Sequence, residues 1–387
     1  MLGLGTLLPW NFFMTAIMES SLGDTLANQT QAAGEDRSIL EAKFNNLMTF
    51  FAMLPLLCTC LNSILHSLIV FKCWAALLSS CLFFIITAII VKVPLEPLTF
   101  FCLTMVKIVI INSFGAVLQG SLFGMAGLLP ASYTTLIMSG QGLAGSFAAF
   151  AMICAIASGS DLHDSAFGSF ITACTVIFMC ILSYVVLPKL EYFQEVKKID
   201  NCSTDQTKRQ KISVVKIFKK VCLECIFQMN IFPIFCQLKF TKNDQYFVPV
   251  SCFLLFNLCD WGGRSLTALC MWSRKDSLLL PGMIECHVIF IPLFMLCNVQ
   301  PHLHLPVLFY HDAFFILFMI LFAFSNGYLA SLCMFLPHEA ETAGTIMAFF
   351  LSLGLALGAA LLSEHLFNWE NYSGYFGKNP KKQKNLL

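Results

Sequence analysis

Long apolar blocks separated by short polar segments run through this sequence and limit its fold more strongly than any motif. A helix needs about 20 mainly apolar residues to cross a bilayer, and within lipid every backbone polar group must be satisfied internally. Eleven blocks of roughly this kind cover residues 1–18, 46–70, 73–93, 99–129, 134–157, 166–187, 213–238, 246–272, 278–299, 310–336 and 342–367. The pattern predicts an all-α integral membrane protein with about 11 transmembrane helices and termini on opposite sides.

Composition agrees with this class of protein. Hydrophobic residues make up 58% of the chain and charged residues 12%, about half the charged fraction of a soluble domain. The net charge of +1 gives no global field that would recruit nucleic acid. Most of the 18 cysteines lie inside apolar blocks, where cysteine acts as a small hydrophobe. We therefore expect the lipid bilayer as a partner, but no metal, no nucleic acid and no obligate protein partner.

The loops indicate the orientation and the division of the chain. The acidic segment 19–45 contains a glycosylation sequon at Asn28 and is expected outside, whereas the basic linker 188–212 is expected in the cytoplasm. The linker separates six spans from five, as in a carrier whose two halves move around a central site. The predicted parts are an N-terminal six-helix half at 1–187, the linker at 188–212, a C-terminal five-helix half at 213–367 and a polar tail at 368–387.

The block at 213–238 is the weakest, because Lys216, Lys219 and Lys220 crowd its start. The C-terminal tail is also basic, although eleven spans would place it outside. If the weak block does not insert, the tail lies inside, in better agreement with the charge rule. Both arrangements remain open at this point.

Motifs for enzymes are nearly absent. The only GxGxxG match, Gly140 to Gly145, lies inside an apolar block and follows no strand, so we interpret it as a helix-packing element. GxxxxGK[ST], HExxH and GxSxG do not occur in the sequence. The pair Gly120 and Gly124 has the GxxxG spacing by which membrane helices approach each other closely. The sequence predicts no enzyme, no ATP-driven pump and no cofactor.

Ionisable residues inside a span are the sharpest functional signal, since a charge at mid-membrane is costly unless it is paired or faces water. Asp260 and Arg264 stand four residues apart in the block 246–272, within pairing reach on one helix face. We favour a functional pair, with a purely structural ion pair as the alternative. Lys107 lies near the start of its block and is expected to extend toward the interface.

Uncharged polar and aromatic residues in the spans suit a neutral, ring-bearing solute that forms hydrogen bonds. Gln119 and Ser121 offer donors and acceptors, and Trp10 with Asn11 adds an aromatic face and an amide. The alternative for each is helix packing or anchoring at the interface.

At these residues the sequence resembles the equilibrative nucleoside transporter family, most closely its type 1 members. The matching stretches are MLGLGTLLPWNFFMTA, INSFGAVLQGSLFGMAGLLPASYTTLIMSGQGLAG, VPVSCFLLFNLCDWGGRSLTA, FAFSNGYLASLCMF and AETAGTIMAFFLSLGLALGAA. The resemblance implies eleven helices in a major-facilitator-like arrangement, with a cytosolic N-terminus. It also implies passive, sodium-independent transport of purine and pyrimidine nucleosides by alternating access, with inhibition by nucleoside analogues.

The resemblance also implies roles for individual residues. Trp10 takes the position of an aromatic against the ligand ring, Gln119 that of a base-recognising glutamine, and Asp260 with Arg264 that of a charged pair near the ribose. Asn28 matches a glycosylated asparagine of the first outer loop. Further expected substrate-site positions are Leu7, Asn11, Met14, Met53, Leu56, Gly115, Ser121, Phe232, Phe253, Asn257 and Leu355.

The chain departs from the family pattern in four places. It starts at a Met inside the first span, it is shorter by about half a helix around 221–245, and the stretch between the tenth and eleventh spans is reduced to LPHEAE. Beyond Leu361 the resemblance ends. The main hypothesis is a nucleoside carrier of the plasma membrane. The alternatives are a truncated protein that binds ligands without transporting them, and a proton-linked carrier of organic cations or nucleosides.

Overall fold

The computed structural model describes residues 1–13, 15, 51–52, 55, 69–91, 97–126, 131–159, 162–189, 239–240, 247–270, 282–283, 286–287, 289–297, 299–300 and 307–334. Helices dominate these residues, which confirms the predicted helical membrane fold. The described strands are short: β1, Lys239–Phe240, pairs antiparallel with β2, Val299–Gln300. This small sheet was not expected from the apolar pattern.

The long helices coincide with the predicted blocks to within a few residues. After an N-terminal helix at residues 2–13, they are α3 (Ile69–Val91), α4 (Pro97–Ala126), α5 (Ala131–Ser158), α6 (Leu162–Val186) and α13 (Asp312–Met334). A short 3₁₀ turn, Leu187–Lys189, follows α6. All five of these long helices are apolar and long enough to cross a membrane. The total of eleven spans stays a prediction, because the other predicted spans are described only in part or not at all.

The region 246–272 forms two kinds of helix. A π-helical segment, Val248–Leu254, continues directly into α10, Leu255–Leu266. π-helical turns are rare and occur often at functional sites, because they shift the side chains that follow. The predicted block at 278–299 contains the short helix α12, Phe290–Met295. Apolar periodicity alone could not distinguish these forms from a regular span.

Side chains on the outer faces of the long helices are apolar, as a lipid environment requires. On α3 the exposed residues Leu78, Leu82, Ile85 and Ile89 repeat every three or four positions. Polar Ser80 and Thr87 of the same helix are buried, and the Thr87 hydroxyl donates to the Phe83 carbonyl. This arrangement places apolar groups toward lipid and keeps polar groups inside, bonded to the helix itself.

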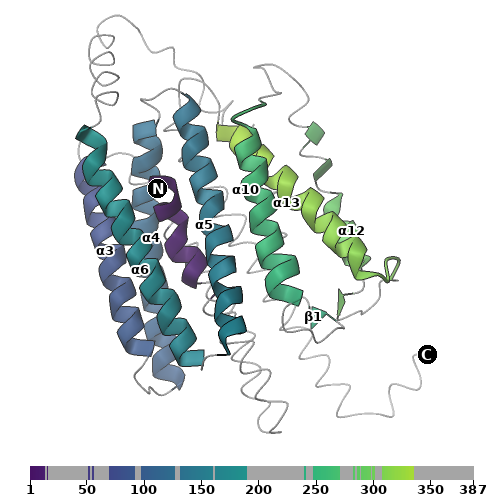
Figure 1. Ribbon diagram of the computed structural model, residues 1–387, viewed down its shortest axis with the longest axis horizontal. Coiled ribbons are helices and arrows are strands. Elements are labelled where there is room, and N and C mark those ends of the chain that lie inside the picture. The colour runs from purple at the N-terminus through teal and green to yellow at the C-terminus, as the bar shows by residue number, and fades with distance from the viewer. Residues whose placement is uncertain are drawn as a thin grey trace, which may run out of the picture.

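Helix α5 connects two groups of helices (Figure 1). The N-terminal helix, α3, α4 and α6 pack around one apolar core that includes Ala144 and Ala148 of α5. The π-helical segment, α12 and α13 form a second core that includes Ala149 and Met152 of the same helix. On the side away from the first group, α5 packs along α10, and α10 packs along α13. The candidate functional residues are distributed over these contacts.

Candidate functional site

Asp260 and Arg264 form a buried ion pair within α10. Arg264 Nε donates to Asp260 Oδ2 at 2.7 Å, and the two residues are 9% and 4% exposed. Burial of two charges is tolerated when they are paired and their remaining polar atoms are bonded. The pairing expected from the spacing is present. A role in substrate binding stays a prediction.

Asn326 of α13 is a third member of this buried group, because it also bonds to Asp260. Its Nδ2 atom donates to Asp260 Oδ1 at 2.8 Å, and the residue is 3% exposed. Both oxygens of the carboxylate are therefore engaged, one by each helix. Sequence reasoning missed Asn326, although a buried amide inside the resembling stretch FAFSNGYLA was a visible signal.

Two glycines allow α10 and α13 to approach closely enough for this bond. A Cβ on Gly263 would overlap the carbonyl oxygen of Phe324, and one on Gly327 would overlap that of Asp260. Each helix thus presents a glycine to the backbone of the other. Close contact through small residues is how helices associate in lipid.

A similar seam joins α5 to α10. Trp261 Nε1 donates to Ser139 Oγ at 3.0 Å, and Ser139 Oγ lies 2.9 Å from Ser265 Oγ. A Cβ on Gly142 would meet the Trp261 backbone, and one on Gly145 would overlap the Asn257 side chain. The GxGxxG match at 140–145 is therefore a helix-packing element, as predicted. Since α5 lies in the first predicted half and α10 in the second, this seam joins the two.

Gln119 and Ser121 lie on different sides of α4. Residues two positions apart in a helix do not face each other. Ser121 is buried, on the side of α4 that faces Cys73 of α3 and Tyr184 of α6. Gln119 is half-buried, and none of its hydrogen bonds reaches a described residue. Of this predicted pair, Gln119 is the residue whose amide is left to contact a solute.

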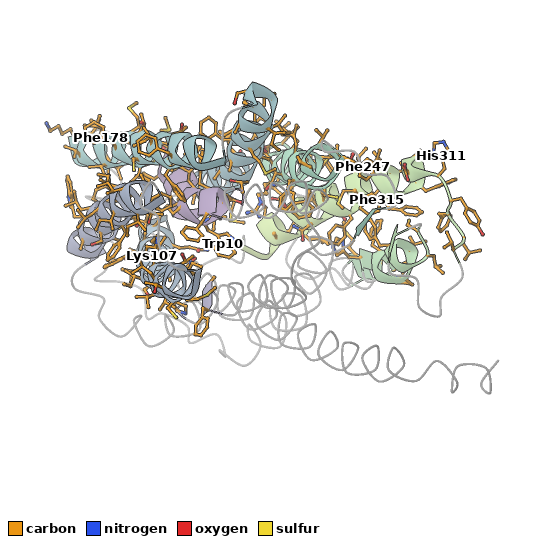
Figure 2. All side chains as sticks on the ribbon, turned by 90° about the horizontal axis from the view of Figure 1, so that it is seen from below. Trp10, Lys107, Phe178, Phe247, His311 and Phe315 are labelled. Atoms are coloured by element: carbon orange, nitrogen blue, oxygen red, sulfur yellow. The ribbon has the colours of Figure 1, made fainter. Side chains whose placement is uncertain are left out.

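The N-terminal helix positions Trp10, which is half-buried and packs with Leu7 against the first core. Asn11 donates from Nδ2 to the Leu7 carbonyl at 2.9 Å, so its amide is partly used within the helix. Figure 2 shows Trp10 among the N-terminal helices, in the same part of the molecule as Lys107 and away from Phe247 and Phe315.

Other expected site residues are placed as follows. Gly115 of α4 lies near the Thr6 carbonyl of the N-terminal helix, with room for a Cβ at 3.8 Å. Phe253 is buried in the second core, and Asn257 donates from Nδ2 to the Phe253 carbonyl at 2.8 Å. The expected residues that lie outside the described ones are Met14, Asn28, Met53, Leu56, Phe232 and Leu355.

One expectation about α4 is wrong, and a second finds no support among the described residues. Lys107 does not extend to the interface, because it is only 5% exposed and faces the helix bundle. Gly120 is exposed, and no described atom would lie within 4 Å of a Cβ there, so it makes no close helix contact within the described chain. Spacing alone shows where such residues stand along a helix, but their surroundings decide which way they face.

A buried hydrogen bond between Thr6 and Gln141 was also missed. Gln141 Nε2 of α5 donates to Thr6 Oγ1 of the N-terminal helix at 3.0 Å, and Thr6 Oγ1 donates to the Gly3 carbonyl at 2.7 Å. Both side chains are buried. Gln141 is a polar residue within an apolar block, and that signal could have identified it. Among the described residues no cluster of metal-binding side chains occurs.

Comparison with known proteins gives a consistent result. The profile of the nucleoside transporter family matches residues 105–217 and 200–364. Equilibrative nucleoside transporter 1 of Homo sapiens is 49% identical over 427 residues, which cover 93% of this chain and 94% of the relative. Equilibrative nucleoside transporter 2 of Rattus norvegicus is 41% identical, with the same coverage of 93% and 94%. Equilibrative nucleoside transporter 3 of Rattus norvegicus is 32% identical, covering 94% and 87%.

The higher identity to the type 1 relative than to these type 2 and type 3 relatives agrees with the resemblance observed in the sequence. The matches also extend over almost the whole chain, including the α4, α5, α10 and α13 regions that carry the buried polar contacts.

Proposed function

This chain belongs to the equilibrative nucleoside transporter family, and we propose that it carries purine and pyrimidine nucleosides down their gradients by alternating access. The observation that carries this proposal is the buried network of Asp260, Arg264 and Asn326 inside an apolar helix pair. Its net charge is zero, so it suits a neutral solute with several hydroxyl groups better than an ion. Facilitative transport also needs no energy source beyond the solute gradient.

The base of the nucleoside would be recognised by Trp10 and Gln119. An indole ring stacks on any base, while a glutamine amide both donates and accepts hydrogen bonds at the edge of a base. Trp10 is half-buried rather than enclosed, and the Gln119 amide has no described partner to compete with a ligand. Arg264 would meet the sugar, and nucleoside-analogue inhibitors would bind the same site.

The proposed location is the plasma membrane, with lipid around the apolar faces of the helices. The protein acts as a carrier and not as an enzyme, without a cofactor or an obligate protein partner. The two predicted halves, 1–187 and 213–367, would move relative to each other at the seam between α5 and α10. The linker at 188–212 would connect the two halves, and the tail at 368–387 would extend from the end of the second half.

A proton-linked mechanism has less physical support. A protonated carboxyl group carries an O–H donor, so a carboxyl group that takes up and releases a proton during transport fits best where its oxygens do not both face N–H donors. Both oxygens of Asp260 accept hydrogen bonds, from Arg264 and Asn326. Arg264 and Asn326 therefore already engage the carboxyl group that a proton-linked mechanism would use.

Uptake of radiolabelled uridine and adenosine into cells that lack nucleoside transport tests the proposal, with surface abundance measured in parallel. We expect saturable flux that does not depend on sodium or on a pH gradient and that a nucleoside analogue blocks. Gln119→Ala should reduce uptake, whereas Ser113→Ala should not, because among the described residues the Ser113 hydroxyl bonds only to the Val109 carbonyl of its own helix. Normal surface abundance without flux would contradict the carrier proposal and favour a ligand-binding protein.

A further inference from the structure

The two oxygens of Asp260 are held from two different helices. Arg264 Nε reaches Oδ2 at 2.7 Å from the same helix, and Asn326 Nδ2 reaches Oδ1 at 2.8 Å from α13. The Gly327 contact with the Asp260 backbone brings α13 close enough for this second bond. A carboxylate bonded at both oxygens cannot rotate about its side-chain axis without breaking one bond.

The fixed carboxylate determines the direction of the guanidinium group. Arg264 uses only Nε in this pair, and no described residue accepts a hydrogen bond from its two Nη atoms. Because a guanidinium group is planar, fixing Nε fixes the plane and the direction of the four remaining N–H bonds. Those bonds form a fork that can donate to neighbouring hydroxyl oxygens.

The chemical type of Asn326 fits this task. An amide supplies a donor without a charge, so the network of Asp260, Arg264 and Asn326 stays neutral. A lysine or arginine in its place would compete with Arg264 for the carboxylate and leave one positive charge unbalanced in an apolar region. A neutral donor holds Asp260 in place, and the negative charge of Asp260 is then balanced by Arg264 alone.

Resting on the proposed function, we propose that Asn326 is a positioning residue for sugar recognition: it holds Asp260 so that the Nη fork of Arg264 donates to the 2′- and 3′-hydroxyl oxygens of the nucleoside. Arg264 alone touches the sugar, and Asp260 acts through it. The two residues of the ion pair therefore have different roles, although they would otherwise be treated as one binding unit.

The test compares initial rates for uridine and for 2′,3′-dideoxyuridine, normalised to surface protein. Asn326→Ala should raise the KM for uridine about tenfold, the value of one well-aligned hydrogen bond, and change Vmax less than about twofold. The KM for 2′,3′-dideoxyuridine should change less than about twofold, since that analogue lacks the hydroxyls concerned. Asn112→Ala is the matched control, because Asn112 is also buried but its side chain, within the part of the chain that the structure describes, bonds only to the Ile108 carbonyl of its own helix.

A swapped double variant, Asp260→Asn with Asn326→Asp, separates positioning from structure. It keeps one carboxylate and one amide between α10 and α13, and so preserves charge and interhelical bonding. Thermal stability should return close to that of the native protein, while the KM for uridine stays raised because the Arg264 fork is no longer aimed by residue 260. If Asn326→Ala lowers surface abundance too far, Asn326→Ser is measured in the same way.

Three results would overturn the inference. One is an unchanged uridine KM in the Asn326→Ala variant, and another is an equal rise for both substrates. The third is full recovery of uridine KM in the swapped variant, which would make the bond purely structural. A native protein that carries neither substrate would instead contradict the proposed function, and that outcome is read before any variant.

Discussion

Gly142 of α5 lies so close to Trp261 of α10 that a Cβ on the glycine would approach Trp261 Cα to 2.9 Å. The Trp261 indole, in turn, donates to Ser139 one turn earlier on α5. Backbone proximity and a side-chain bond therefore secure the same crossing. Since this crossing joins the two predicted halves, its geometry sets how close they come.

Gly142→Leu should separate α5 from α10, because the atom nearest to the added Cβ, Trp261 Cα, is backbone and cannot move aside. Overpacking of this kind costs about 1–3 kcal/mol. We expect a lower thermal midpoint of the purified protein and reduced surface abundance. Gly120→Leu is the matched control, since that exposed position has space. Equal behaviour of the two variants would show that the seam is not tightly packed.

How far the sequence predicts the fold depends on the range of the interaction. Helix positions follow from apolar length, so α5 at Ala131–Ser158 matches the predicted block 134–157. The Asp260 and Arg264 pair follows from a spacing of one turn. The partner of Asn326 could not be predicted, because its bond to Asp260 spans 66 residues and depends on how α10 and α13 cross.

Some features of the predicted site could be derived from the sequence and others could not, for a related reason. The opposite directions of Gln119 and Ser121 were predictable from helix geometry, because two residues correspond to just over half a turn. The burial of Lys107 was not, since it depends on neighbouring helices rather than on distance from the helix end. The resemblance to a family supplied the roles, and the local sequence supplied only the types of residue.

The bond between Thr6 and Gln141 predicts unequal effects of removing its two partners. Thr6→Val leaves the buried Gln141 amide without its acceptor and should cost about 1–2 kcal/mol. Gln141→Leu should cost less, because the Thr6 hydroxyl still donates to the Gly3 carbonyl. Thermal unfolding of both variants and of the double variant measures the coupling. A larger loss for Gln141→Leu would contradict this reasoning.

The protein should be less stable with its native His287 than with phenylalanine at this position. Its Nδ1 lies 2.9 Å from Ser325 Oγ, and the Ser325 hydroxyl is placed to donate to the Leu321 or the Phe322 carbonyl, so Nδ1 is the donor in the tautomer that fits these bonds. Nε2 is then a buried acceptor with no partner among the described residues. The ring stacks on Phe322 with centroids 4.5 Å apart, a contact that phenylalanine can keep.

We therefore expect His287→Phe to raise the free energy of unfolding by about 1 kcal/mol and to raise the thermal midpoint accordingly. Ser325→Ala should lower it, because both ring nitrogens of His287 would then lack partners. Thermal unfolding in detergent checks both changes. A destabilised His287→Phe variant with normal packing would indicate that Nε2 has a partner in the native protein.

Arg264→Lys should separate the charge of the arginine from its shape. A lysine can still pair with Asp260, so stability should change by less than about 1 kcal/mol, but a single ammonium group lacks the planar fork. We expect the KM for uridine to rise about tenfold, with little change for 2′,3′-dideoxyuridine. Arg264→Gln should instead leave Asp260 as an unpaired buried charge, cost about 3–5 kcal/mol and reduce surface abundance. Lys189→Arg, at the end of α6, is a charge-preserving control that should leave both substrates unaffected. Normal uridine affinity in Arg264→Lys would mean that charge alone is enough at this position, because a point charge would then serve the sugar as well as the fork.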